Sequence, residues 1–227
     1  MMKHTNLALF DLDHTLIPGD SDLLWTKFLV ARKQIKEVNT RLSDRFFAQY
    51  KNGTLNLNEF LHYQLKPLKV IEKSSLLSLR EDFIREEIRP IISKKVKELV
   101  KSHLEAGHLC ALVTATNEFI TKPIAEIFGF HKLIATLVEE DSEGEYTGRT
   151  YGVASFQEGK IIRVKEWLDS LRFKLHDFEK TFFYSDSVND IPLLDAVTDP
   201  IATNPDDVLL EHAEKRGWQI IKLFDNA

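Results

Sequence analysis

The sequence of 227 residues lacks several features that mark whole classes of protein. It holds a single cysteine, Cys110, so an internal disulfide is impossible and the cytoplasm is the expected location. No apolar run approaches the roughly 20 residues that a helix needs to span a bilayer, so a membrane protein is not expected. The apolar stretch within the first ten residues ends at Asp11 and is too short for a secretion signal.

The sequence also has no excess of basic side chains. Thirty Lys and Arg face 35 Asp and Glu, which gives a formal net charge of −5 at pH 7. Proteins that bind nucleic acid or anionic membranes usually carry a positive balance, so neither partner is expected. Hydrophobic residues make up 43% of the chain, enough for one globular core and an additional subdomain. Nothing in the sequence indicates an oligomeric state.

Short apolar runs alternate with helical patterns along most of the chain. Continuous apolar runs, typical of strands buried on both faces of a parallel sheet, occur at 7–10, 109–113, 181–184 and 218–221. Amphipathic helical patterns occur at 94–104, 118–128, 161–171 and 208–215. The alternation predicts an α/β fold with a doubly wound, Rossmann-like parallel sheet.

One stretch departs from this alternation. Between about residues 20 and 90 the spacing is helical only, in segments at 22–32, 42–50, 57–65 and 75–88. Asn52-Gly53 and Lys66-Pro67 predict turns between these helices. We therefore expect an all-helical cap subdomain at 19–89, inserted into a core domain made of 1–18 and 90–227. Residues 139–152 predict a β-hairpin or an extended connection.

Two carboxylates stand directly after the first predicted strand. In the segment DLDHT, Asp11 and Asp13 are two residues apart, so in an extended chain they point to the same side. Ligands of open α/β sheets bind at the carboxyl ends of the strands. Such a pair can supply a nucleophile or metal ligand and a general acid or base. A polar strand exit that caps a turn would use the same residue types.

A second acidic segment, YSDSVND, follows the strand predicted at 181–184. Its acids, Asp186 and Asp190, reach the same edge as Asp11 if the strands are parallel. Mg²⁺ prefers oxygen ligands, usually one or two carboxylates with water and phosphate. We therefore predict that Asp186 and Asp11 bind a metal ion. Asn189 is equally suited to be the N-cap of the next helix.

Two further positions have the chemistry of phosphate binding. Thr114 ends the strand predicted at 109–113, and its hydroxyl and the following backbone N–H groups can hold a phosphoryl oxygen at a helix start, although Thr often caps helices. Lys160 stands at a predicted helix start, where a cation opposes the helix dipole, so a charge-balancing role is favoured. Lys165, one turn later, is the alternative and is expected to face solvent.

Together these stretches resemble the four ordered motifs of the haloacid dehalogenase superfamily of phosphotransferases. They are hydrophobic-D-x-D-x-T at Asp11 and Asp13, a strand ending at Thr114, Lys160, and D-x-x-x-D at Asp186 and Asp190. A helical insert between the first two motifs resembles the small-cap subclass that includes phosphoserine phosphatase.

The resemblance implies a role for each motif residue. Asp11 attacks the phosphorus of a phosphate monoester and becomes a phosphoaspartate, while Asp13 protonates the leaving alcohol and then activates water. Thr114 and Lys160 bind the phosphoryl oxygens. The implied Mg²⁺ ligands are the Asp11 side chain, the Asp13 backbone carbonyl and Asp186, with Asp190 and Asn189 in support.

The resemblance also implies substrate contacts at Thr15, Ala115, Asn117 and Asn189. Phosphoserine phosphatases carry a cap Glu soon after the first motif and a cap Arg that grips the substrate carboxylate. Here Asp20 stands near the first position and His62 at the second, and His does not supply a bidentate guanidinium. The expected substrate is therefore a small phosphate ester, with phosphoserine and histidinol phosphate as specific alternatives. A phosphotransferase or mutase, or a non-catalytic binding module for phosphorylated metabolites, are alternatives of other classes.

Overall fold

The structure is a computed structural model that describes residues 5–36, 42, 45, 46, 48, 49 and 54–224. Its centre is a seven-stranded sheet with the order β4-β3-β2-β1-β5-β6-β7. The strands are β1 (Asn6–Phe10), β2 (Leu109–Asn117), β3 (Lys132–Glu140), β4 (Tyr146–Tyr151), β5 (Lys180–Ser185), β6 (Asp199–Thr203) and β7 (Gln219–Ile221). Neighbouring strands are parallel except β3 and β4, which form an antiparallel hairpin. The predicted α/β fold with a mostly parallel sheet is confirmed.

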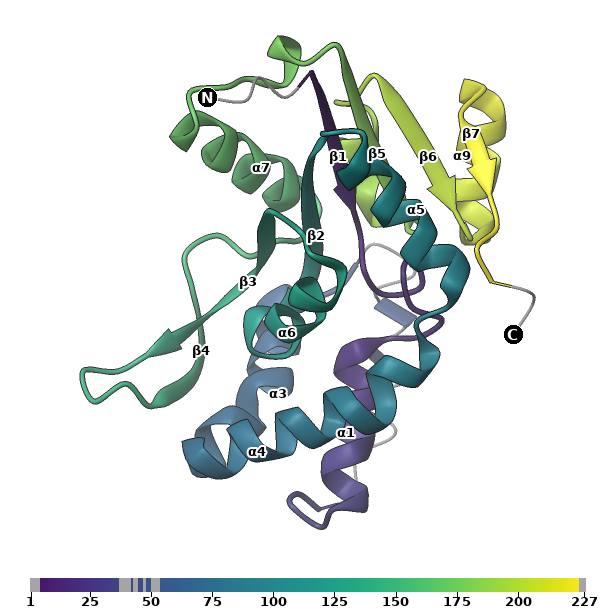
Figure 1. The fold of residues 1–227 in the computed structure, drawn as a ribbon. Coiled ribbons are helices and arrows are strands. Elements are labelled where there is room, and N and C mark those ends of the chain that lie inside the picture. Colours follow the sequence, from purple (N-terminus) through teal and green to yellow (C-terminus); the bar gives the residue numbers. More distant parts are fainter. Residues whose placement is uncertain (1–4, 37–41, 43–44, 47, 50–53, 225–227) are drawn as a thin grey trace.

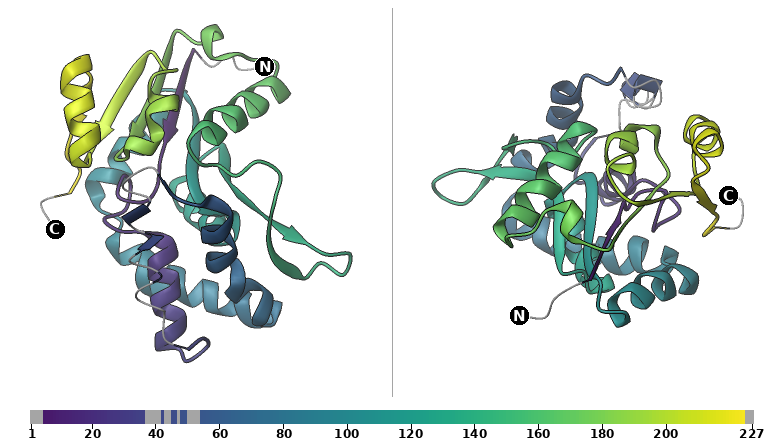
Figure 2. Two further views of the ribbon diagram at one scale, coloured as in Figure 1. Left: turned by 180° about the vertical axis from the view of Figure 1, so that it is seen from behind. Right: turned by 90° about the horizontal axis from the view of Figure 1, so that it is seen from above.

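Helices cover both faces of the sheet (Figure 2). The helices α5 (Lys94–Glu105) and α6 (Glu118–Phe128) pack on one face, and α7 (Glu158–Ser170), α8 (Ile191–Leu194) and α9 (Asp207–Arg216) pack on the other. Side chains of β1 alternate between the two cores, Ala8 and Phe10 facing one, Leu7 and Leu9 the other. Because both faces are buried, the strand sequences read as continuous apolar runs.

Helices formed by described residues between β1 and α5 lie beyond the carboxyl ends of the parallel strands (Figure 1). They are α1 (Ser21–Ala31), α3 (Leu57–Val70), α4 (Lys73–Phe83), a π-helical turn (Ile84–Ile88) and a short 3₁₀ turn (Arg89–Ile91). Within the described part of 18–92 there is no strand. The Trp25 ring packs on Phe28, Phe83 and Phe119, with centroid distances of 5.9, 5.2 and 5.8 Å. Since Phe119 belongs to α6, the helical segment shares its core with the sheet domain.

The hairpin of β3 and β4 gives this helical segment a second support. α3 packs along β4, and a Cβ built on Gly148 would lie 3.0 Å from the Cβ of Lys69. The Lys73 ammonium lies 2.9 Å from a Glu140 carboxylate oxygen and 4.6 Å from the centre of the Tyr146 ring. The helices are therefore attached both to α6 and to the hairpin.

Several local predictions need correction. The turn predicted at Lys66-Pro67 is wrong, because α3 continues through Pro67 to Val70. Burial of Leu65, Pro67 and Leu68 offsets the backbone hydrogen bond that proline cannot donate. Strand β3 lies mostly outside the predicted strand segments, and β6 lies wholly outside them. The helix predicted at 42–50 lies only in part within the described residues, and the turn at Asn52-Gly53 lies outside them.

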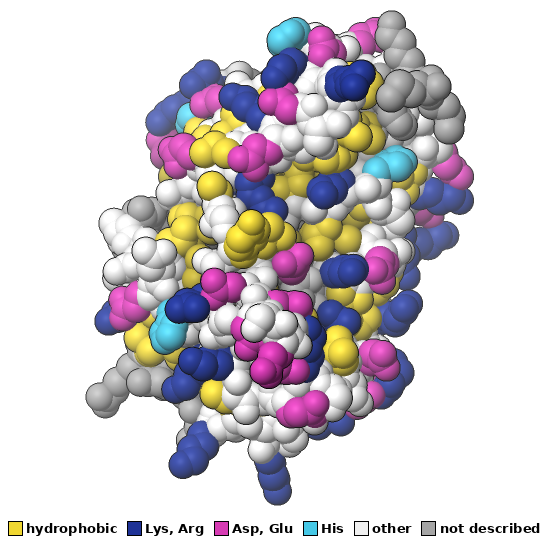
Figure 3. All heavy atoms as spheres, turned by 90° about the vertical axis from the view of Figure 1, so that its left-hand side faces the viewer, with side chains coloured by type: hydrophobic (Ala, Val, Ile, Leu, Met, Phe, Trp, Pro, Cys, Tyr) yellow, Lys and Arg dark blue, Asp and Glu magenta, His cyan; other side chains and the backbone are white. Residues whose placement is uncertain are grey.

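The surface shows no concentration of one charge on the face that Figure 3 presents, which is the left-hand side of Figure 1. Lys and Arg side chains are interspersed there with Asp and Glu. Within the described ranges, no helix is long and apolar enough to cross a membrane.

Candidate active site

The candidate site lies where the strand order changes direction. From β1 the sheet continues through β2 and β3 on one side and through β5 and β6 on the other. Asp11 directly follows β1, and its backbone N–H donates to the Tyr184 carbonyl of β5 at 2.9 Å. Such switch points at strand carboxyl ends are the ligand sites of open α/β sheets.

Lys160 joins two of the predicted acids. Its Nζ lies 3.0 Å from an Asp11 oxygen and 2.7 Å from an Asp190 oxygen. Asp190 also accepts the Ser185 hydroxyl at 2.6 Å. Burial alone would lower the pKa of Lys160, but the carboxylates of Asp11 and Asp190 outweigh it and raise that pKa. The buried ammonium therefore stays charged beside Asp11.

The backbone before Lys160 is tightly constrained. A Cβ on Gly159 would lie 2.0 Å from the Ala154 carbonyl oxygen, so only glycine fits there. Gln157 has a φ of +48°, a left-handed conformation rarely adopted by a residue with a side chain. Its amide donates to the Asn189 side-chain oxygen at 2.9 Å. The turn that positions Lys160 is thus tied to the segment that carries Asp190, a link that the sequence did not indicate.

Asp186 lies close enough to Asp11 for the two carboxyl groups to interact electrostatically. Thr15, which is fully buried, donates its hydroxyl to Asp186 at 3.0 Å. Burial, then the charges of Asp11 and Asp190, raises the pKa of Asp186 well above its usual range. Burial likewise raises the pKa of Asp11 to about 8, although Lys160 opposes the shift. Three carboxyl groups thus share one ammonium, and their ionised forms need further positive charge.

This donor set fits Mg²⁺. Asp11 and Asp186 offer carboxylate oxygens, and the excess negative charge favours a divalent cation. Among the described side chains, no three His, Cys, Asp or Glu residues form a complete ligand group. Mg²⁺ does not require one, since it usually keeps several waters and binds one or two carboxylates together with substrate phosphate.

Asp13 has different neighbours from Asp11. One carboxylate oxygen accepts the Ser21 backbone N–H at 2.7 Å, and the other accepts the Thr116 hydroxyl at 2.7 Å. Ser21 begins α1 and Thr116 lies in β2, so the helical segment and the sheet both hold Asp13. In the part of the chain that the structure describes, Asp13 makes no salt bridge.

The end of β2 is irregular around Thr114. The predicted strand end at Thr114 is wrong, because β2 continues to Asn117. The pairing of β2 with β3 shifts register between Val113 and Asn117. The Thr136 hydroxyl donates to the Ala115 carbonyl at 2.7 Å, and the Thr116 N–H donates to the Thr114 hydroxyl at 3.2 Å. Thr114 lies two residues beyond Leu112, which pairs with Phe10 of β1, and from the irregular segment Thr116 bonds to Asp13.

Two predicted substrate residues cap helices in this structure. Asp20 is the N-cap of α1 and accepts the Leu23 N–H at 2.8 Å; burial, then the charge of Asp13, raises its pKa to about 6. Asn117 is the N-cap of α6, and its amide donates to Asp22 at 2.9 Å. Asp22 is buried and was not predicted.

Asn189 and His62 were also predicted to contact the substrate. Asn189 is buried, and it is not the N-cap of the next helix, because Asp190 precedes α8. Ser187 caps the short turn Val188–Asp190, which contains Asn189. His62 is exposed on α3. Contacts of these residues, and of Asp20 and Asn117, with a substrate stay predictions.

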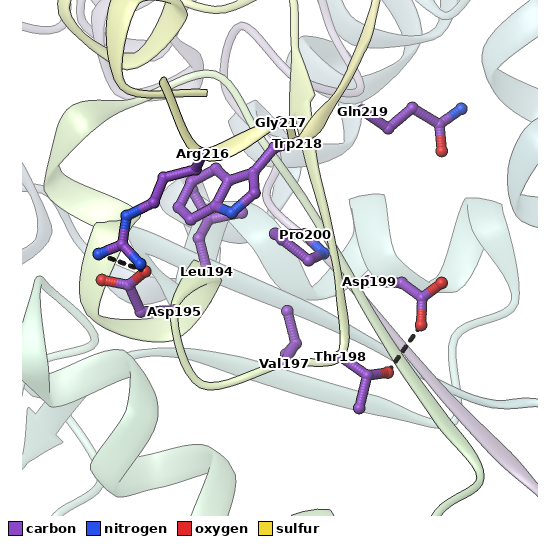
Figure 4. Close-up of a pocket in the computed structure, with 10 residues that line it drawn as sticks. All are labelled: Leu194, Asp195, Val197, Thr198, Asp199, Pro200, Arg216, Gly217, Trp218 and Gln219. Atoms are coloured by element: carbon purple, nitrogen blue, oxygen red, sulfur yellow. Dashed lines mark hydrogen bonds and ion pairs between the residues drawn. The ribbon is translucent and has the colours of Figure 1, made fainter. Parts of the chain in front are cut away.

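A pocket of about 370 Å³ lies at the opposite end of the sheet, beside the amino ends of β6 and β7 (Figure 4). Arg216 and Asp195 pair across it at 3.5 Å, and Thr198 donates to Asp199 at 2.7 Å. It is separated from Asp11 by the length of the strands, so it is no part of the candidate site.

Known proteins resemble this chain over nearly its whole length. A family model for haloacid dehalogenase-like hydrolases matches residues 8–195. A histidinol-phosphatase from Neisseria meningitidis serogroup C (strain 8013) is 41% identical over 217 residues, which cover 95% of this chain and 98% of that protein. The crystal structure of a protein of unknown function from Bordetella pertussis Tohama I matches with a TM-score of 0.91 at 46% identity, covering 98% of this chain and 100% of that one.

A phosphoserine phosphatase structure with a phospho-aspartyl intermediate analogue matches with a TM-score of 0.69, covering 99% of this chain and 96% of that one. At 19% identity, this match shows a common fold. The family model and the histidinol-phosphatase relative carry the assignment further. The chain belongs to the haloacid dehalogenase-like hydrolase family and is a phosphatase of that family.

Proposed function

We propose that this phosphatase is Mg²⁺-dependent and hydrolyses a small phosphate monoester through a phosphoaspartate at Asp11. The observation that carries the proposal is the contrast between the two acids of the first motif. Asp11 lies 3.0 Å from the Lys160 ammonium, whereas Asp13 accepts hydrogen bonds from the neutral donors Ser21 and Thr116. A nucleophilic carboxylate needs charge compensation, and a general acid and base needs a fixed direction.

The proposed reaction has two steps. A carboxylate oxygen of Asp11 attacks phosphorus as the bond to the alkoxide oxygen breaks, and Asp13 gives that oxygen its proton. Asp13 then takes a proton from a water molecule, whose oxygen attacks the phosphorus of the phosphoaspartate and releases phosphate and the Asp11 carboxylate. Phosphoryl transfer depends mainly on positioning and on stabilisation of charge.

The remaining motif residues would bind the phosphoryl group. The Thr114 hydroxyl and the Lys160 ammonium are suited to its oxygens. Thr114 lies two residues beyond Leu112, the β2 partner of Phe10, and Lys160 is 3.0 Å from Asp11. Asp11, the Asp13 carbonyl and Asp186 would hold Mg²⁺, with Asp190 keeping Lys160 in place. When bound, the ion supplies the positive charge that lets an anionic carboxylate approach an anionic phosphate.

The substrate that we favour is L-histidinol phosphate. It carries an amine and an imidazole but no carboxylate, so it needs no arginine at the position of His62. The relative that is 41% identical over nearly the whole chain is a histidinol-phosphatase. The carboxylate of Asp20, beside Asp13, has the charge that suits an ammonium group. Phosphoserine is the second candidate, supported by the common fold with phosphoserine phosphatase.

A phosphate-release assay over small phosphate esters tests this proposal. We expect L-histidinol phosphate to give the highest kcat/KM, and we expect EDTA to abolish turnover and added Mg²⁺ to restore it. Asp11→Asn should remove turnover, whereas Asp207→Asn, at an exposed position in α9, should leave it unchanged. Activity that survives in Asp11→Asn would refute the assignment of Asp11 as the nucleophile. A higher kcat/KM for phosphoserine would make phosphoserine the substrate in place of L-histidinol phosphate.

A further inference from the structure

Thr116 is a buried side chain in direct contact with the proposed general acid. It is 6% exposed, and its hydroxyl donates to an Asp13 carboxylate oxygen at 2.7 Å. The second Asp13 oxygen is held by the Ser21 backbone N–H. Two hydrogen bonds, one on each oxygen, fix both the position of the carboxylate and the rotation of its plane.

The backbone around Thr116 holds its hydroxyl in place. The irregular pairing of β2 with β3 lies at this point, and irregularities of this kind redirect side chains next to active sites. The Thr116 N–H donates to the Thr114 hydroxyl, and the preceding carbonyl, of Ala115, accepts the Thr136 hydroxyl. Contacts within β2 and with β3 therefore hold the backbone that carries Thr116.

A second carboxyl group, that of Asp22, also contacts the Thr116 hydroxyl. Asp22 bonds to the side chains of both Thr116 and Asn117. Burial raises the pKa of Asp22 well above its usual range, although these two bonds oppose the shift. The Thr116 hydroxyl, which donates to Asp13 at 2.7 Å, therefore lies between the carboxyl groups of Asp13 and Asp22.

We propose that Thr116 is a positioning residue that holds the Asp13 carboxyl group in line with the leaving oxygen of the substrate. This inference rests on the proposed function, because it requires Asp13 to be the proton donor. Without the hydroxyl, Asp13 keeps only the Ser21 bond and can rotate. Misplacement by about 1 Å can cost an enzyme about 100-fold in rate.

The inference predicts a dependence on the leaving group. An alkoxide must receive a proton as its bond to phosphorus breaks, whereas p-nitrophenolate leaves without one. The parameter kcat/KM reports the steps up to release of the alcohol, so it isolates the protonation from the later attack of water. Loss of Thr116 should therefore reduce kcat/KM for alkyl phosphates far more than for p-nitrophenyl phosphate.

The test compares L-histidinol phosphate, or phosphoserine if the wild type prefers it, with p-nitrophenyl phosphate. Thr116→Val should lower kcat/KM about 100-fold for the alkyl ester and less than about 3-fold for the aryl ester. Thr116→Ser keeps the hydroxyl and should return the alkyl value to within about 3-fold of wild type. The control is Thr121→Val, which removes the hydroxyl of a buried threonine that bonds to the Asn117 carbonyl, and both values should stay near wild type.

Equal losses for the two esters in Thr116→Val would overturn the inference, as would a serine variant as slow as the valine variant. If the valine variant does not fold, Thr116→Ala serves in the same comparison and must show the same unequal losses. Failure of the proposed function gives a different result: a wild-type protein that hydrolyses neither ester, or an Asp11→Asn variant that keeps turnover.

Discussion

Asp11 and Asp13 are two residues apart at one strand end, yet their surroundings differ in kind. Asp11 shares a buried ammonium with Asp190 and interacts electrostatically with Asp186. Asp13 accepts hydrogen bonds from a backbone amide and a hydroxyl. Residue type alone therefore does not determine the roles of paired acids. Their neighbours do: an ammonium compensates the charge of Asp11, and hydrogen bonds orient the carboxyl group of Asp13.

The two acids also depend on different parts of the molecule. Asp11 is held by Lys160 of α7 and by the end of β5, both in the sheet domain. Asp13 takes one of its two bonds from Ser21, the first residue of α1. A change at the start of the helical segment should therefore disturb Asp13 more than Asp11.

Removal of the Asp13 proton should have the largest of the effects that separate the two acids. Asp13→Asn keeps the size of the side chain but cannot transfer a proton. We expect kcat/KM for an alkyl phosphate to fall about 10³-fold, within the range usual for general acid and base catalysis. The fall for p-nitrophenyl phosphate should be at least about tenfold smaller. Similar falls for both esters would show that Asp13 does not protonate the leaving group.

Removal of the charge beside Asp11 should come next. Lys160→Met leaves Asp11, Asp186 and Asp190 without their ammonium, so we expect kcat/KM to fall about 10²- to 10³-fold. Because charge compensation is needed for every ester, the alkyl and aryl substrates should lose equally. Lys165→Met, at an exposed position in the same helix, is the matched control and should behave as wild type. A fall of less than about tenfold would contradict the role assigned to Lys160.

A smaller effect should follow from loss of the second Asp13 bond. Ser21→Pro removes the backbone N–H that donates to Asp13, and its ring would displace the carboxylate. The helix should tolerate the change, because Pro is favoured at the first helical position and Asp20 already has an extended backbone, with φ −99° and ψ 116°. We expect kcat/KM for the alkyl ester to fall about 10- to 100-fold. Ser21→Ala keeps the N–H and should remain near wild type; if it falls as far, the backbone bond is not the cause.

A change of pH should also alter the contribution of His103 to the free energy of unfolding. His103 bonds to His108 and to the Tyr184 hydroxyl, and burial, together with His108, lowers its pKa to about 4. At this residue the unfolded chain, with a His pKa of about 6.5, binds more protons between these values, so the contribution of His103 to stability falls as pH is lowered from about 6.5 to 4.

Urea unfolding of the wild type and of His103→Gln at pH 7 and pH 5 measures this effect. The comparison is needed because the buried acids, whose pKa values are raised, change the stability in the opposite direction over the same range. From pH 7 to pH 5 we expect the change in the wild type to be less favourable than that in His103→Gln by about 2 kcal/mol. Removal of the exposed imidazole in His176→Gln should leave the wild-type pH dependence as it is. The same pH dependence in the wild type and in His103→Gln would contradict a neutral, buried His103.

The sequence was most informative where chemistry and local pattern coincide. The apolar run ending at Asp11, the acids after β5 and a lysine at a predicted helix start identified residues that the structure brings to one edge. A continuous apolar run is enough to predict such a strand, because a strand buried on both faces is apolar throughout. The strand β6, which contains Pro200 and begins with an acid, lacks that pattern and was missed.

The residues that hold Asp13 could not be predicted in the same way. Thr116 bonds to Asp13 from the segment where β2 changes register beside β3, and there the hydroxyl of Thr136, which is distant in sequence, bonds to the Ala115 carbonyl. Asp22 reads as an ordinary acid in the first turn of a helix, and only its bond with Asn117 shows that it is buried between α1 and α6. Contacts between distant segments determine both positions, and no local pattern encodes them.

The most direct test of the account is identification of the residue that receives the phosphoryl group. The enzyme is mixed with substrate and Mg²⁺, quenched in acid during turnover and treated with borohydride, which reduces an acyl phosphate to the alcohol. Peptide mass spectrometry then locates the change. The account predicts conversion of Asp11 to homoserine with Asp13 unmodified; modification at Asp13, or at another carboxyl group in place of Asp11, would contradict it.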